Sequence, residues 1–253
     1  MSLHLITLPT FYALAVPAVV LTGIAKAGFG GALGGFAVPL MSSVVTPGDA
    51  AGIMLPLLCF TDVSGLRPFL FKWDRASVRL LIPAGIAGVV AGALLYPWMS
   101  QALVRVLIGL ISVLFVLHGW LLAPRLAARA APPGPRSGLA CGAVGGFTSF
   151  LAHAGGPPLL IHLLPQGFDR VRFVATMNVY FLVINWTKLV PYTLEGQFSA
   201  RNLGTSLLLA PLVPVGVWLG LRLQARVNEL WFYRIARLGL LLTGVKLIAK
   251  GLQ

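Results

Sequence analysis

Eight polar side chains lie inside apolar stretches of this 253-residue chain, and they are the residues best placed to do chemistry: Lys26, Asp62, His118, His153, His162, Asn178, Asn185 and Lys188. An ionisable or amide group is costly in an apolar medium, so such residues usually face a partner or a cavity. Lys26 precedes one glycine-rich break, GFGG at 28–31, and His153 precedes another, AGGPP at 154–158. The two breaks are therefore the first places to expect a binding site.

The residue types at these breaks favour an anion. Lys26 supplies a cation, and a helix that starts after the second break would present free N–H groups and a positive dipole end. His153 adds a hydrogen-bond donor, or a proton acceptor that titrates near neutrality. The alternatives are a snorkelling lysine and a buried histidine bonded to a carbonyl. The expected anion-binding residues are Lys26, Gly28, Gly30, Gly31, His153, Gly155 and Gly156.

A second group of polar residues shares one apolar helix. Asn178 and Asn185 are seven residues apart and so lie on one face, and Lys188 is three residues beyond Asn185. With Thr176 they could line a polar path to the substrate, and we count all four as expected substrate-binding residues. The alternative is hydrogen bonding between helices, with Lys188 snorkelling outward.

Asp62 is the only acid well inside an apolar run, 55–66, and with His153 it is the expected carrier of a coupled proton. The competing interpretation is an interfacial ion pair with Arg67, five residues on. We expect His118 and His162 to be structural.

The composition predicts a membrane protein: 58% of residues are hydrophobic, 10% are charged, and the mean hydropathy is +0.90. The net charge of +13 does not indicate nucleic-acid binding, because the basic residues lie at the ends of apolar segments, where they orient spanning helices. Two cysteines within apolar segments offer neither a disulfide framework nor a zinc site. We expect no cofactor and no metal.

We predict an all-α polytopic membrane protein made of two inverted-topology repeats, with Gly-rich broken helices and eight to ten spans. The ten expected elements cover residues 9–26, 30–44, 48–66, 76–98, 101–123, 137–153, 156–165, 171–191, 202–222 and 233–250. Residues 1–253 would form one transport domain. It comprises a first repeat at 1–124, a cytoplasmic linker at 125–136 and a second repeat at 137–253.

Internal offsets support the repeat. Gly30 and Gly31 match Gly155 and Gly156 at an offset of 125, and Asp62 matches Asn185 at an offset of 123. Glycine pairs also recur at the spacing that lets membrane helices approach closely; these pairs are Gly88/Gly92 and Gly216/Gly220. Five elements per half is an odd number, so the second half should run inverted.

The basic residues predict the orientation. If the loop at 67–79 is cytoplasmic, alternation places the loops at 124–136, 165–172 and 222–237 on the same side, and these regions hold 13 of the 19 basic residues. The opposite side receives Arg105, Arg201, Lys246 and Lys250. This asymmetry is a strong positive-inside signal.

An intramembrane enzyme is the alternative from another class. Residues 152–156, AHAGG, match half of the rhomboid protease pattern, but the nucleophile half, GxSG, is absent and Ser149 alone is weak evidence. The sequence contains neither HExxH nor a Walker motif. Paired Gly-rich breaks near the start of each half instead point to the midplane site of a secondary transporter.

The chain resembles the TauE/SafE sulfite exporter family over nearly its whole length. The resemblance rests on KAGFGG at 26–31 with VPL at 38–40, FKWD at 71–74, HAGGPP at 153–158, AT at 175–176, NWTKLVPY at 185–192 and GVWLGLRL at 216–223. It implies transport of small sulfur-containing or organic anions such as sulfite, thiosulfate and sulfoacetate, and it fixes neither substrate nor direction.

We therefore expect a secondary transporter of a small anion in the cell membrane, and its coupling to protons is left open. Its expected partners are the anionic substrate and the lipid bilayer, without nucleic acid, and association into a homo-oligomer is left open. A channel-like or metal-linked permease, an intramembrane enzyme and a non-transporting membrane scaffold remain the alternatives.

Overall fold

The computed structural model describes residues 5–29, 31, 34–117, 120–121, 133–223 and 229–253. Within these ranges every regular element is helical. Four helices are long and apolar enough to cross a membrane, or five if a bent pair counts as one span. The chain is thus an all-α polytopic membrane protein. Much of the expected linker at 125–136 lies outside the described residues, as do Gly30 and His118.

The helices of the first half are α1 (Pro9–Phe29), α2 (Ala37–Ser42), α3 (Pro47–Leu66), α4 (Arg75–Leu95) and α5 (Gln101–Leu117). Those of the second half are α7 (Pro135–Ala152), α8 (Gly156–Leu163), α9 (Arg170–Leu194), α10 (Ala200–Leu209), α11 (Leu212–Leu223) and α12 (Glu229–Leu252). The element expected at 202–222 is two helices, which meet at 44°. Pro211 lies in the turn between them, and proline cannot donate the N–H that would continue α10.

Side-chain caps mark where several helices begin. Thr46 accepts a hydrogen bond from Asp49 N, Asp74 accepts from Ser77 N, and Ser199 accepts from Asn202 N. Each cap satisfies one of the free N–H groups of a helix start. These polar starts lie at the ends of the bundle, which leaves the apolar helix bodies in its middle.

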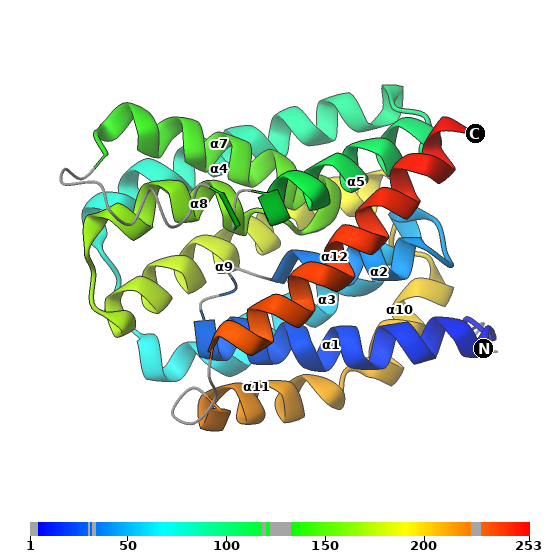
Figure 1. Cartoon of the computed structure of the whole chain (residues 1–253), viewed down its shortest axis with the longest axis horizontal. Helices are drawn as coiled ribbons and strands as arrows, with labels where there is room; N and C mark the ends of the chain where they lie inside the picture. Colours follow the sequence, from blue (N-terminus) through cyan, green and yellow to red (C-terminus); the bar gives the residue numbers. More distant parts are fainter. Residues whose placement is uncertain (1–4, 30, 32–33, 118–119, 122–132, 224–228) are drawn as a thin grey trace.

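Two close helix pairs form the outer parts of the bundle. In Figure 1, α4 lies along α7 and α1 lies along α11, and these are among the most extensive helix contacts. Glycine permits both. A Cβ atom on Gly88 would lie 2.9 Å from Phe147 N, and one on Gly216 would lie 2.7 Å from Val20 O. The glycine pairs noted in the sequence therefore serve helix packing, the interpretation that their spacing favours.

Some of the helix contacts correspond in pairs when the two halves are aligned. The five helices α1–α5 can be aligned in order with α7, α8, α9, the bent pair α10–α11, and α12. In this alignment the α4–α7 contact corresponds to the α11–α1 contact. The α3–α9 and α5–α12 pairs each correspond to themselves. The α2–α3 contact has no comparable α8–α9 counterpart among the described residues, so the two repeats and their boundaries stay a prediction.

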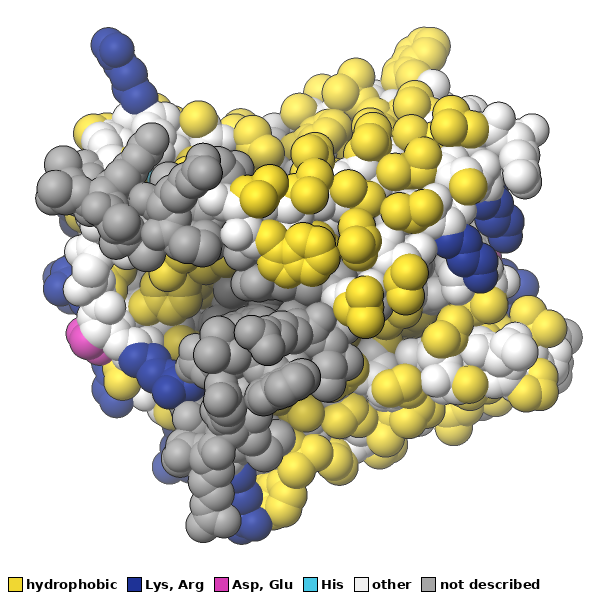
Figure 2. Space-filling view, viewed as in Figure 1, with side chains coloured by type: hydrophobic (Ala, Val, Ile, Leu, Met, Phe, Trp, Pro, Cys, Tyr) yellow, Lys and Arg dark blue, Asp and Glu magenta, His cyan; other side chains and the backbone are white. Residues whose placement is uncertain are grey.

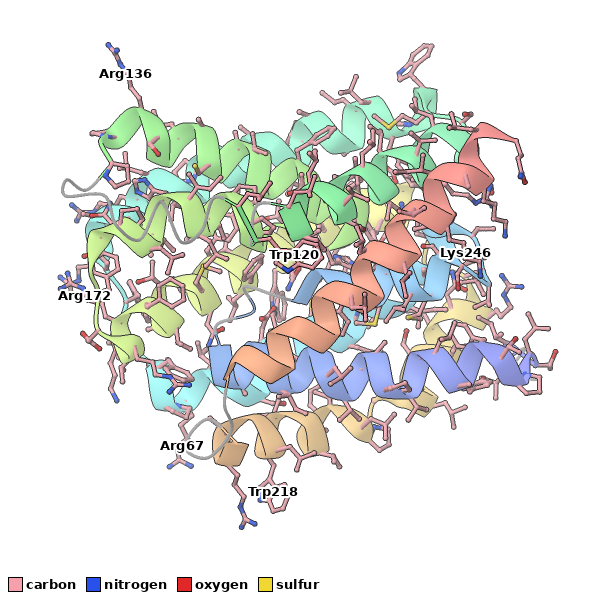
Figure 3. All side chains as sticks on the ribbon, viewed as in Figure 1. Arg67, Trp120, Arg136, Arg172, Trp218 and Lys246 are labelled. Carbon is pink, nitrogen blue, oxygen red and sulfur yellow. The ribbon has the colours of Figure 1, made fainter. Side chains whose placement is uncertain are left out.

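Basic side chains gather at the two ends of the bundle. Figure 3 places Arg67, Arg136 and Arg172 at one end and Lys246 at the other, where both chain termini lie in Figure 1. Between the ends, most of the described side chains on the face in Figure 2 are hydrophobic. These labelled residues, which the sequence assigns to opposite sides of the membrane, thus lie at opposite ends of the bundle.

Candidate functional site

Two helix breaks, each with one residue in the left-handed backbone region, form the frame of the site. The first follows α1, where Gly31 has φ +72° and its N–H bonds to Ala25 O at 3.1 Å. The second follows α7, where His153 has φ +52° and Ala154 N–H bonds to Thr148 O at 3.3 Å. Both hydrogen bonds reach six residues back, one residue further than the 6→1 bond of a Schellman helix end. A left-handed histidine is uncommon, and such backbone outliers concentrate at functional sites.

Lys26 and Asp62 form a buried ion pair beside these breaks. Lys26 is only 5% exposed, and Asn185 Nδ2 donates to the second carboxylate oxygen of Asp62 at 2.7 Å. Asp62 therefore pairs with a lysine 36 residues away, and the ion pair with Arg67 considered from the sequence is wrong. Arg67 is exposed at the end of α3 instead.

Lys188 provides a second buried cation. It is fully buried, and its Nζ donates to Ser149 O at 3.1 Å, to Ser149 Oγ at 3.1 Å and to His153 Nδ1 at 2.7 Å. An ammonium has three hydrogens, so these three acceptors suit the charged form. No carboxylate of the described residues forms an ion pair with Lys188. Its ammonium group is therefore stabilised by hydrogen bonds to uncharged acceptors.

His153 is held by both ring nitrogens. Nε2 lies 3.1 Å from Ala51 O, and a carbonyl can only accept, so Nε2 carries the hydrogen. Nδ1 then accepts from Lys188. These partners assign a neutral imidazole. The contact with a carbonyl matches the structural alternative for His153, while the contact with Lys188 places it in the polar cluster.

Together these residues surround a small cavity between α1, α3, α7 and α9. Its volume is about 10 Å³, and its lining comprises Lys26, Gly31, Leu58, Ser149, His153, Phe181 and Asn185. This is roughly the space of one water molecule. A ligand larger than a water molecule would have to displace some of these side chains.

The glycines expected at the site differ in whether they line this cavity or pack against other helices. A Cβ atom on Gly31 would lie 3.1 Å from Lys26 Cγ, so Gly31 borders the cluster directly. Gly155 lies against α7, and a Cβ atom there would lie 2.6 Å from Gly145 O. Gly28 instead packs on Gly220 of α11.

The N-terminus of α8 has fewer free donors than its position suggested. Gly156 is its first residue and is buried, but the next two residues are Pro157 and Pro158. Proline has no N–H, so these two positions offer no donor. Any anion affinity of this break must come mainly from the lysines.

The polar stripe on α9 divides into two parts. Asn185 and Lys188 join the central cluster, but Thr176 donates to Arg172 O at 2.7 Å and accepts from Asp74 N at 2.9 Å. Thr176 therefore fastens the segment before α4 to α9. Asn178 is buried and is not part of the cavity lining. The continuous path from Thr176 to Lys188 stays a prediction.

The Thr176 end carries its own ion pair, between Arg172 and Asp74. Burial opposes ionisation of Asp74, but hydrogen bonds from Ser77 and the Arg172 guanidinium outweigh it and lower the pKa of Asp74. A charged pair thus links α4 to α9 at the basic end of the bundle.

Sequence reasoning undervalued Ser149, which binds Lys188 through both its carbonyl and its hydroxyl. The internal offset between the two halves could have indicated Ser149 as a site residue. Ser149 lies 123 residues after Lys26, and the same offset separates Asn185 from Asp62. The Ser149 hydroxyl contacts Lys188 Nζ, and among the described residues no hydrogen bond joins it to the His153 ring. The described residues therefore do not form the Ser–His pair that the enzyme alternative requires.

Comparison with known proteins identifies the chain's family. The model of the family described as sulfite exporter TauE/SafE matches residues 15–247. No curated protein and no solved structure gives a significant match. The matched range contains both helix breaks, both buried lysines and Asp62. The chain therefore belongs to the TauE/SafE sulfite exporter family of membrane transporters.

Proposed function

We propose that this chain is a secondary transporter of a small sulfur-containing oxyanion or organosulfonate in the cell membrane, and that anion binding is linked to protonation of Asp62. The observation that carries the proposal is the buried Lys26–Asp62 pair in a centre rich in cations. In this structure the Asp62 carboxylate occupies the position at Lys26 that a substrate oxyanion would take.

Protonation supplies the switch. When Asp62 takes up a proton, its attraction to Lys26 weakens and the ammonium becomes free to bind an anion. His153 was the other expected proton carrier, but its two ring nitrogens are already engaged by Ala51 and Lys188. We therefore assign the proton to Asp62 and give His153 the role of positioning Lys188.

Charge balance supports this order of events. With Asp62 ionised and His153 neutral, Lys26 and Lys188 leave the buried cluster at a net charge of +1. A protonated Asp62 together with a bound monoanion gives the same net charge. The carrier can then change conformation in both forms without moving an additional charge through the bilayer, which would be costly.

The test is radiolabelled exchange in proteoliposomes. Vesicles holding the purified protein and unlabelled sulfite are diluted into labelled sulfite or sulfoacetate, since exchange does not depend on the natural direction. We expect saturable exchange for the parent, loss for Lys26→Met, and parental exchange for Lys72→Met, whose lysine is exposed in a loop. A folded parent that exchanges none of these anions would overturn the proposal.

A further inference from the structure

A second cation-lined cavity lies far from the central cluster, at the end of the bundle that holds both termini. Its volume is about 480 Å³. It is bounded by residues 5–8, by the segment at 44–46 before α3, and by charged side chains from four helices: Asp49, Arg105, Arg201 and Lys250. By the orientation predicted from the loops, this end faces the outside. The charges of the lining sum to a net +2.

The single acid of this cavity is already neutralised. Arg201 Nη2 lies 2.9 Å from Asp49 Oδ2, and the Thr46 hydroxyl donates to the same oxygen at 2.8 Å. Asn202 Nδ2 donates to the other oxygen, Oδ1, at 2.9 Å. Asp49 and Arg201 thus form a satisfied pair on one wall of the cavity.

Within the part of the chain that the structure describes, Arg105 and Lys250 have no counter-ion. No carboxylate of the described residues lies within ion-pair distance of either. Arg105 Nη2 reaches only Gln101 Oε1, at 3.4 Å, and its Nε is buried without a hydrogen-bond partner among the described residues. A buried donor with no acceptor is costly and uncommon, so the described residues leave the Arg105 guanidinium incompletely satisfied.

We propose that this cavity is an outer binding site for a small oxyanion, held by the Arg105 guanidinium and the Lys250 ammonium. Guanidinium groups match the oxygens of oxyanions geometrically. A concave, positively charged surface also raises the local concentration of anions. The site is distinct from the Lys26 cluster, and it would collect anions at the outer mouth of the transporter.

The test measures the local potential without relying on transport. Thr7, an exposed lining residue, is changed to cysteine in a chain with Cys59→Ala and Cys141→Ala. Modification by an anionic and by a cationic thiosulfonate reagent is timed in phosphatidylcholine liposomes, relative to a free thiol. We expect the anionic reagent to be favoured about tenfold. We also expect sulfate to slow its reaction more than chloride at equal ionic strength.

The matched variants decide the outcome. Arg105→Gln with Lys250→Gln should remove both the preference and the protection by sulfate. Lys246→Gln, one turn earlier on α12 and outside the lining, should leave them in place. No preference in the parent, or the same preference in the double variant, overturns the site. Protection by sulfate that disappears when phosphatidylglycerol is added assigns the cavity to a lipid headgroup and also overturns the proposal.

Discussion

At the residue scale, the central feature is the buried ion pair of Lys26 and Asp62, in which each charge is stabilised by the other. Sequence reasoning identified Lys26, Asp62, His153, Asn185 and Lys188 because ionisable and amide groups stand out in apolar runs. It could not pair them. Pairing depends on how distant helices meet, whereas the sequence shows only neighbours such as Arg67. Ser149 escaped because a hydroxyl inside a helix usually needs no special partner.

The first prediction concerns this pair. Lys26→Met should lower the thermal stability of the detergent-solubilised protein, since removing one partner of a buried ion pair costs roughly 3–5 kcal/mol. Adding Asp62→Asn should restore most of the stability, because the uncompensated carboxylate is gone. Neither variant should exchange sulfite. Melting followed by tryptophan fluorescence, with exchange assays alongside, checks this. A single variant as stable as the parent, or a double variant that exchanges sulfite, contradicts it.

At the element scale, hydrophobic runs and glycine breaks located most helices well. The breaks at 28–31 and 154–158 correspond to the helix ends after α1 and α7. The bend between α10 and α11 was not expected, because proline is common within membrane helices and its effect depends on the surrounding packing. The short α2 was predicted too long for a similar reason, since apolar composition does not mark where a turn becomes helical.

Close helix packing gives the second prediction. Gly88→Ala should destabilise the protein by about 1–3 kcal/mol, because the new methyl group would press on the backbone of α7. Gly65→Ala is the matched control, since a Cβ atom there meets nothing within 4 Å. The comparison is made by thermal unfolding in detergent. Equal effects of the two substitutions would show that the α4–α7 contact does not limit stability.

The turn after α9 gives a prediction about pH. Burial raises the pKa of Glu195 to about 7, although a hydrogen bond from Gln197 lowers it in part. A raised folded-state pKa means that the folded protein binds the proton more tightly, so this contribution to stability is present in acid and is lost as pH rises towards about 7. Glu195→Gln should flatten the fall in melting temperature between acidic and neutral pH. An unchanged pH profile in that variant would contradict it.

At the scale of the whole molecule, charge and composition were sufficient to predict a polytopic bundle with basic residues at both ends. The positive-inside imbalance also predicts which end is cytoplasmic. Lys72→Cys and Trp98→Cys, each placed in the chain lacking Cys59 and Cys141, should therefore react with a membrane-impermeant reagent from opposite sides. Trp98 is 87% exposed, at the end that carries the proposed outer site. Labelling of both positions from the same side of intact cells would refute the topology.

The central claim is that the Asp62 carboxylate competes with the substrate for Lys26 until Asp62 is protonated. Accumulation of sulfite driven by a pH gradient tests this claim most directly. Sulfite uptake is measured in proteoliposomes with an inward proton gradient and a membrane potential clamped at zero. The parent should accumulate sulfite several-fold above equilibration, as coupling to the gradient requires. Asp62→Asn should still exchange sulfite but should no longer respond to the gradient. If Asp62→Asn accumulates sulfite with the same dependence on the gradient as the parent, Asp62 does not carry the proton and the account is wrong.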